Sequence, residues 1–130
     1  LKEAGAQVDI EDLPRCIGDT DQVRQAFTNI IDNAIKYRHP SRQLKIQIRG
    51  VAGEKLSGYC FEDNGIGIAE KDIAGIFNLY YQLQRKEMTG EGIGLSTVKK
   101  MVEHNGGKVE VESEENKGSR FWVWLPTARR

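Results

Sequence analysis

Polar side chains that suit metal and phosphate chemistry recur at helical spacing in the first third of the sequence. They follow the pattern i, i+4, i+8, i+11, which places them on one face of a helix: Gln25, Asn29, Asn33 and Lys36. A solvated helix face is the ordinary alternative for such residues. Asparagine is a mediocre helix former, however, so two of them one turn apart indicate a role that lysine or glutamate cannot fill. Amide oxygens suit Mg²⁺, which takes oxygen ligands and usually keeps water and phosphate oxygens in its shell.

A second candidate is an acidic residue followed by a glycine-rich segment, residues 63–68 (Asp-Asn-Gly-Ile-Gly-Ile). Gly65 and Gly67 let the backbone approach a flat ligand closely, because glycine has no side chain. A fixed Asp63 carboxylate there can accept a hydrogen bond from an exocyclic amine. The alternative is a hairpin turn or a helix-entry turn, since Asp, Asn and Gly also favour turns.

A third candidate is residues 90–95 (Gly-Glu-Gly-Ile-Gly-Leu), which lead into a helix predicted to begin near Ser96. Amide groups that glycines expose at the start of a helix bind phosphate well. The glycine spacing differs from the dinucleotide-binding fingerprint, and no Gly-Lys-Ser/Thr follows as in a Walker A loop. On its own this segment is weak evidence for a phosphate site, so its interpretation depends on the other two candidate segments.

Hydrophobic periodicity and turn residues predict the elements that position these residues. A long helix begins at Asp19 or Thr20 and continues to His39-Pro40. The other predicted elements, in chain order, are two brief strands or a hairpin-like entry at 7–17, strands at 44–49 and 59–62, a short helix at 69–79, a loop at 82–94, a helix at 95–104, and strands at 108–113 and 120–125. This order predicts an α+β fold in which helices cover one face of a mixed sheet.

Length and composition predict a single globular domain over residues 1–130. Nineteen basic and 19 acidic side chains leave no net charge, so DNA and RNA are poor candidate partners. No apolar stretch approaches the roughly 20 residues that span a bilayer, and we therefore expect a cytoplasmic domain without membrane contact. We expect Cys16 and Cys60 as reduced thiols, and the start at Leu1 indicates a piece of a longer protein.

The order of these segments resembles the ATP-binding catalytic domain of sensor histidine kinases. Residues 29–37, 63–68, 76–77 and 90–95 are similar to the N, G1, F and G2 boxes of that family, and residues 118–121 resemble its last glycine box. The joint pattern is far more specific than any single box. The resemblance implies the Bergerat fold, an α/β two-layer sandwich whose mixed, mainly antiparallel sheet is covered by helices on one face.

The resemblance also implies ATP and Mg²⁺ as ligands and assigns residues to them. Asn33 would ligate Mg²⁺ with Asn29 in support, and Lys36 would meet phosphate. Asp63 would bind the adenine amine, with Tyr37 flanking the base. The implied ATP-binding residues are Asn29, Asn33, Lys36, Tyr37, Asp63, Gly65, Gly67, Ile68, Phe77, Arg85, Gly90, Gly92, Ile93, Gly94, Leu95 and Ser119.

The remaining implied roles concern the glycines, the lid and a hydroxyl. The glycines of residues 63–68 would make room for the purine, and those of residues 90–95 would wrap the phosphates. Phe77 would anchor a flexible lid, and Ser119 would assist at the adenine through water. Many relatives carry an arginine after the F box, where this chain has Gln82. Either a basic lid residue such as Arg85 substitutes for it, or phosphoryl transfer is slow, because charge stabilisation is much of what a protein supplies to this reaction.

In this family the γ-phosphate passes to a histidine on a separate dimerisation domain, the histidine phosphotransfer domain of the same protein, with a response regulator downstream. His39 and His104 lack the acceptor's sequence context, so that domain is expected to supply both the acceptor and the catalytic base. Hydrolysing relatives such as gyrase, Hsp90 and MutL place a glutamate at the position of Asn29, which disfavours an autonomous ATPase. A non-catalytic nucleotide-binding or interaction module and another protein kinase of the GHKL superfamily stay as alternatives.

Overall fold

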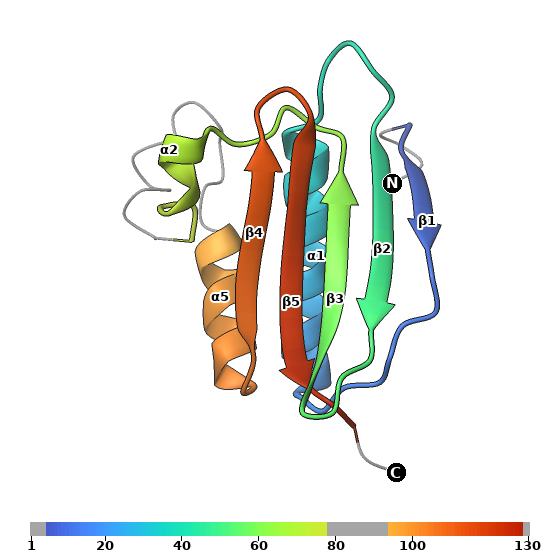
Figure 1. Ribbon diagram of the computed structural model, residues 1–130, viewed down its shortest axis with the longest axis vertical. Coiled ribbons are helices and arrows are strands. Elements are labelled where there is room, and N and C mark those ends of the chain that lie inside the picture. Colours follow the sequence, from blue (N-terminus) through green and yellow to red (C-terminus); the bar gives the residue numbers. More distant parts are fainter. Residues whose placement is uncertain (1–4, 78–93, 129–130) are drawn as a thin grey trace.

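The computed structural model describes residues 5–77 and 94–128, which contain one five-stranded sheet (Figure 1). The strands are β1 (Gln7–Ile10), β2 (Lys45–Val51), β3 (Leu56–Asp63), β4 (Lys108–Glu114) and β5 (Gly118–Pro126). They lie in the order β1-β2-β3-β5-β4, with β1 parallel to β2 and every other pair antiparallel. The middle strand of the sheet, β3, therefore pairs with β5, which follows β4 in the sequence.

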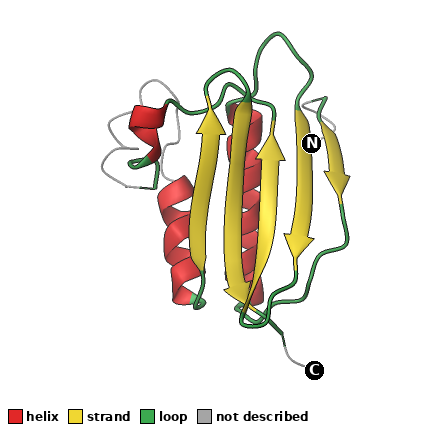
Figure 2. Cartoon of the chain, viewed as in Figure 1, coloured by secondary structure: helices red, strands yellow, loops and turns green. Residues whose placement is uncertain are grey.

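Within residues 5–77 and 94–128, three helices accompany the sheet: α1 (Thr20–Lys36), α2 (Glu70–Ile73) and α5 (Gly94–His104). The two longer helices, α1 and α5, lie side by side on one face of the sheet, whereas α2 lies beyond the β4 edge (Figures 1 and 2). The other face of the sheet carries no helix among the described residues. This is the two-layer α+β sandwich with a mixed, mainly antiparallel sheet that the sequence predicts, and the fold class is confirmed.

Helix α1 begins and ends where its local sequence requires. The Asp19 carboxylate caps it by accepting the Gln22 N–H at 2.9 Å, and the Tyr37 N–H bonds to the Asn33 carbonyl at the other end. Its buried residues, Ala26, Ile30 and Ala34, recur every four positions and face the sheet. The predicted start at Asp19 or Thr20 is therefore correct, and the regular helix ends before His39-Pro40.

The core lies between α1, α5 and the inner face of the sheet. Alternate residues of β3 and β5 point into it, because successive side chains of a strand face opposite sides. Phe27 of α1 packs on Tyr59 and Phe61, with ring centroids 5.4 and 5.0 Å apart. The residues buried in this core include Ile30, Ile46, Ile48, Tyr59, Phe61, Val98, Val102, Phe121, Val123 and Leu125.

The helix-free face of the sheet carries two stacked tryptophans. Trp122 and Trp124 lie with ring centroids 5.4 Å apart and nearly parallel planes. Gly58 lies opposite Trp124 in the adjacent strand, and a Cβ there would come within 2.7 Å of the Trp124 ring. Cys60 is completely buried, and this burial raises the pKa of its thiol. The tryptophan pair thus covers the middle of this face.

A ladder of charges continues across the same face. Glu62 accepts from Arg49 at 2.8 Å and from Arg120 at 3.2 Å, and Arg120 also reaches Glu112 at 3.4 Å. Burial opposes ionisation of Glu62, but its two arginine partners outweigh that effect and lower its pKa. The strands are therefore linked by ion pairs as well as by their backbone.

The beginning of the chain differs from the predicted pair of strands or hairpin. Only residues 7–10 form a strand, and it adds to the sheet edge parallel to β2; Cys16 makes an isolated bridge to Thr127. A parallel pair needs a long crossover, and the chain between β1 and β2 supplies one through α1. The spacing of apolar residues reveals a strand but not its partner, which is why the prediction was incomplete.

The predicted helix at 69–79 is also shorter than expected within the described chain. It is regular only from Glu70 to Ile73 and continues as turns to Phe77. The predicted loop at 82–94 lies outside the described residues except for Gly94, which opens α5. Over the described ranges, no helix has the length and apolar character needed to cross a bilayer.

Candidate functional site

The amide stripe of α1 meets the first residue of α5. Asn29 is half-buried; its side-chain oxygen accepts from Gln25 Nε2 at 2.7 Å, and its side-chain nitrogen donates to the Gly94 carbonyl at 3.4 Å. The start of a helix carries partial positive charge and exposes amide groups. Asn29 therefore joins the polar face of α1 to an end of α5 that favours anions.

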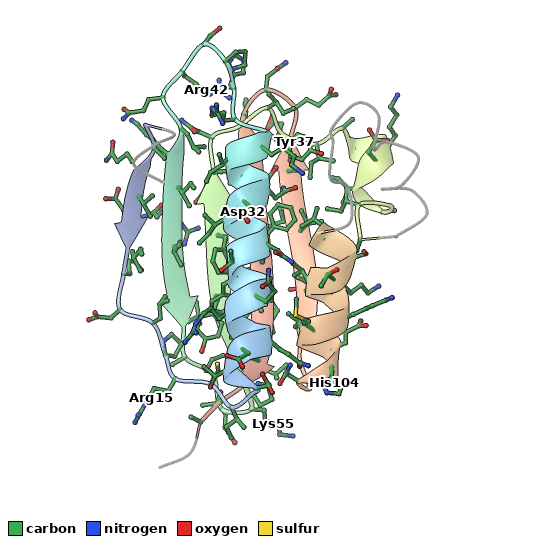
Figure 3. The ribbon with its side chains drawn as sticks, turned by 180° about the vertical axis from the view of Figure 1, so that it is seen from behind. Arg15, Asp32, Tyr37, Arg42, Lys55 and His104 are labelled. Carbon is green, nitrogen blue, oxygen red and sulfur yellow. The ribbon has the colours of Figure 1, made fainter. Side chains whose placement is uncertain are left out.

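The other polar residues of α1 lie further along the same helix. Asn33 is half-buried one turn after Asn29, while Lys36 is exposed in the last turn. Tyr37, labelled in Figure 3, is half-buried at the end of the helix, and its carbonyl accepts the Ile66 N–H at 2.9 Å. The end of α1 is thus attached directly to the glycine-rich segment of residues 63–68.

Asp63 is a half-buried residue at the end of β3. It pairs in register with Ser119 of β5, and its Oδ1 accepts the Gly65 N–H at 2.9 Å. Burial is the largest influence on this carboxyl and raises its pKa; the N–H groups of Gly65 and Ser119 act in the opposite direction, and neighbouring Glu62 adds to the increase. The net result is a raised pKa for Asp63, so its negative charge is less stable than in water and gains from any further donor.

The glycines of the 63–68 segment allow close packing against the protein backbone. A Cβ at Gly65 would lie 2.6 Å from the Tyr37 carbonyl oxygen. Gly67 has a φ of 76°, and a Cβ there would lie 2.1 Å from the Glu114 carbonyl oxygen. Both positions therefore require glycine for the segment to fit between the end of α1 and the end of β4, whatever room they also give a ligand.

A hydroxyl pair supports the next residue of this segment. Ser113 Oγ accepts the Ile68 N–H at 2.7 Å and lies 2.8 Å from Ser119 Oγ. Ser113 also donates to the Gly118 carbonyl at 2.9 Å, so the Ser119 hydroxyl is left to donate to Ser113. The sequence analysis identified Ser119 but not Ser113, whose role depends on the register that places the two opposite each other in β4 and β5.

Arg42 is a second residue that the sequence analysis missed. Its guanidinium donates to three backbone carbonyls: Asn64 at 2.7 Å, Gly65 at 2.9 Å and Asn116 at 2.6 Å. Figure 3 shows Arg42 beyond the end of α1 where Tyr37 lies. Nothing in the polar loop sequence around Arg42 indicates these long-range acceptors, so no local signal was available.

The two ends of the predicted lid begin in the core. Phe77 packs edge-on against Phe121, with ring centroids 6.2 Å apart, and Ile76 and Leu95 are buried. Four predicted site residues between these ends lie outside the described residues: Arg85, Gly90, Gly92 and Ile93. Gln82, where relatives carry an arginine, also lies there.

The described structure thus brings the predicted residues into two groups. One group, at the α1–α5 contact, contains Asn29 and Gly94 with Asn33 one turn away. The other, where β3 ends and β5 begins near the end of α1, contains Asp63 and Ser119. A helix-covered mixed sheet with these two polar groups is the arrangement expected from the resemblance to the ATP-binding domain of histidine kinases.

Comparison with known proteins agrees with this class. Residues 18–129 match the family described as histidine kinase-, DNA gyrase B-, and HSP90-like ATPase, and the chain belongs to this family. The structure also superposes on that of full-length ShkA in complex with AMPPNP, with a TM-score of 0.81 and 26% identity over 99% of this chain and 27% of that one.

Two curated relatives align with almost the whole chain. The phytochrome-like protein Cph1 of Synechocystis is 34% identical over 97% of the chain, and the methanogenesis regulatory histidine kinase FilI of Methanothrix harundinacea is 33% identical over 98%. The chain spans only 17% and 14% of the lengths of these two proteins. The predicted resemblance to the ATP-binding catalytic domain of sensor histidine kinases is confirmed.

Proposed function

We propose that this domain binds Mg²⁺-ATP and donates the γ-phosphate to a histidine on a separate dimerisation domain, in two-component signalling with a response regulator downstream. The observation that carries the proposal is the half-buried Asp63 carboxylate at the end of β3, beside a glycine-rich segment that packs against the end of α1. A partly desolvated carboxylate that retains free acceptor positions is suited to an amine donor such as that of adenine. The AMPPNP complex of the structural neighbour ShkA supports an adenine nucleotide as the ligand.

At the base end, Asp63 accepts a hydrogen bond from the exocyclic amine of adenine. Ser119, which is 8% exposed, assists through water, and Tyr37 flanks the purine ring. Ile68 and the glycines of residues 63–68 complete the surface against which the base lies. These roles are consistent with the positions of Asp63 and Ser119 on adjacent strands.

At the phosphate end, the first residues of α5 face the anionic phosphates, because backbone N–H groups and the helix dipole both favour negative charge there. The amide oxygen of Asn33 is a suitable ligand for Mg²⁺, with Asn29 in support and Lys36 at the phosphates. When bound, Mg²⁺ neutralises phosphate charge. Phe77 anchors the lid, and the remaining proposed contacts are Arg85, Gly90, Gly92, Ile93, Gly94 and Leu95.

This chain's own contribution to transfer is positioning and charge stabilisation. Asn29 carries an amide where hydrolysing relatives place a glutamate, and an amide cannot remove a proton from water. His39 already accepts the Ser41 N–H through Nδ1 at 3.0 Å, and His104 lies in the last turn of α5. The acceptor histidine and the base accordingly come from the dimerisation domain.

Calorimetric titration with ATP, with and without Mg²⁺, tests the proposed site. We expect Mg²⁺ to increase ATP affinity in the wild type, and this increase to disappear in Asn33→Ala. Asp32→Ala is the matched control, because Asp32 is the exposed neighbour on the same helix (Figure 3). Equal responses of the two variants to Mg²⁺ would remove Asn33 from the metal site, and a wild type that binds no ATP would overturn the proposed function.

Transfer requires a second experiment, since binding alone also fits a non-catalytic module. ATP labelled in its γ-phosphate is incubated with this domain and the histidine-bearing dimerisation domain of the same protein. We expect acid-labile, base-stable phosphate on that partner and no release of phosphate by this domain alone. Nucleotide binding without any transfer would favour the interaction module.

A further inference from the structure

Arg42 connects two segments that are far apart in the sequence. Its Nε donates to the Asn64 carbonyl at 2.7 Å, and one terminal nitrogen donates to the carbonyls of Gly65 at 2.9 Å and Asn116 at 2.6 Å. Asn64 and Gly65 follow the proposed adenine-binding carboxylate of Asp63, whereas Asn116 lies in the turn between β4 and β5. The Arg42 guanidinium therefore holds the end of β3 against the turn between β4 and β5.

The Gly65 residue links this guanidinium to the carboxylate. Its carbonyl accepts from Arg42, and its N–H donates to Asp63 Oδ1 at 2.9 Å. The peptide groups on both sides of Gly65 are planar, so fixing the carbonyl restricts the conformations available to a residue that otherwise rotates freely. The orientation of the donor that occupies Asp63 Oδ1 thus depends on Arg42.

The segment has a second attachment that does not involve Arg42. The Asn64 side chain accepts the Lys45 N–H at 2.8 Å and donates to the Gln43 carbonyl at 2.9 Å. This contact holds Asn64 to the beginning of β2 even when the guanidinium is removed. Loss of Arg42 is therefore expected to alter the orientation of Gly65 rather than to detach the whole segment.

We infer that Arg42 is a positioning residue for base recognition: by holding the Gly65 carbonyl, it keeps the Gly65 N–H on Asp63 Oδ1, so that the carboxylate keeps a further acceptor position for the purine amine. The inference rests on the proposed function, because it assigns the base to Asp63. Arg42 acts through Gly65 and sets selectivity for adenine over purines that lack the amine. Arginine suits this role because its planar fork presents several donors in fixed directions, which a lysine ammonium does not.

The test compares the binding of ATP with that of inosine triphosphate, which carries a carbonyl oxygen in place of the adenine amine. Phosphate contacts are common to both nucleotides, so the ratio of their dissociation constants reports on the base alone. For Arg42→Gln we expect ATP affinity to fall roughly tenfold, a factor that corresponds to about 1.4 kcal/mol. Inosine triphosphate affinity should stay within about twofold, and Arg42→Lys should recover only part of the ratio.

Arg38→Gln is the matched control. Arg38 is an exposed arginine just after the end of α1, and it donates to the Ile35 carbonyl in the last turn of that helix at 2.8 Å. We expect its nucleotide ratio to equal that of the wild type. Amide hydrogen exchange in the nucleotide-free protein gives an independent readout: Arg42→Gln should accelerate exchange at Gly65, and Arg38→Gln should not.

The outcomes separate this inference from the proposed function. A wild type that binds ATP no better than inosine triphosphate overturns base recognition by Asp63, and the inference with it. A wild type that prefers ATP, together with an Arg42→Gln variant that keeps the full preference, overturns the inference alone. An equal loss for both nucleotides assigns Arg42 a merely structural role and also overturns it.

Discussion

Replacing Asp63 with asparagine is expected to weaken nucleotide binding while making the folded domain more stable. The amide has nearly the same shape as the carboxylate, so its oxygen can still accept the Gly65 N–H that now lies 2.9 Å from Oδ1. The second position becomes an NH₂ group, which donates where the adenine amine also donates. The substitution therefore removes the oxygen that accepts the hydrogen bond from the adenine amine, and it adds no volume to the side chain.

The size of the binding loss follows from that one contact. A hydrogen bond to a charged group contributes about 1.5–3 kcal/mol. This range corresponds to a weakening of ATP binding by about 10- to 150-fold. Inosine triphosphate presents an acceptor at the same place, so the new NH₂ group can donate to it, and its affinity should stay constant or rise.

The stability gain follows from the raised pKa of the Asp63 carboxyl, which is caused mainly by burial. A carboxyl whose pKa is higher in the folded state than in the unfolded chain stabilises the fold at low pH, and that stability is lost as pH rises through the folded-state value. Asparagine does not titrate. Asp63→Asn should therefore unfold at a higher temperature than the wild type near neutral pH, and this difference should shrink as pH falls towards the ordinary aspartate value of about 3.9.

Calorimetry with both nucleotides and thermal unfolding at several pH values measure these effects. Asp32→Asn makes the same chemical change at an exposed carboxylate of α1 and should alter neither quantity appreciably. Equal weakening of ATP and inosine triphosphate would refute base recognition by Asp63. A lower unfolding temperature for Asp63→Asn at neutral pH would refute the argument that burial dominates its energetics.

Three further predictions concern the frame around the site. Gly67→Ala places a Cβ at a φ of 76° and 2.1 Å from the Glu114 carbonyl oxygen, so chemical denaturation should show a loss of at least about 1–2 kcal/mol. Glu62→Gln should cost about 1 kcal/mol at neutral pH, because the ion pairs are only partly shielded from water; the lowered pKa of Glu62 means that this cost should vanish as pH falls through the folded-state value. Tyr59→Phe should cost about 1 kcal/mol in unfolding free energy, since it removes the 2.7 Å hydrogen bond to the Pro14 carbonyl, and a change near zero would contradict this.

Local patterns in the sequence predicted much of the fold. The Asp19 cap determines where α1 begins, and the repeat of apolar residues determines which side of the helix faces the sheet. Both signals come from residues that are close together in the sequence. The alternation in 120–125 likewise predicted β5, because inward and outward positions differ in polarity. The parallel pairing of β1 was not predicted, since it depends on the path of the intervening chain.

The same contrast between local and long-range information applies to the site residues. The α1 amides were identified because asparagine is unusual within a helix, Asp63 because a glycine-rich segment follows it, and Ser119 because the resemblance extends to residues 118–121. Arg42 and Ser113 were missed, because their partners are backbone groups that only the folded register brings near them. Their residue types in polar segments are ordinary.

The pairing of β3 with β5 determines when the base end of this site can form during synthesis. Asp63 lies near the middle of the chain, but the strand that carries its partner Ser119 is the last of the sheet. A nascent chain that has emerged only as far as β4 lacks the strand that lies between β3 and β4 in the sheet, and so leaves the β3 edge unpaired, a state that is slow to resolve and open to wrong association. Nucleotide stabilises only the state that binds it, so ATP in the cell cannot assist the growing domain. Under the proposed function, ATP can stabilise only molecules in which β5 has already paired with β3, so binding reports that the sheet has closed.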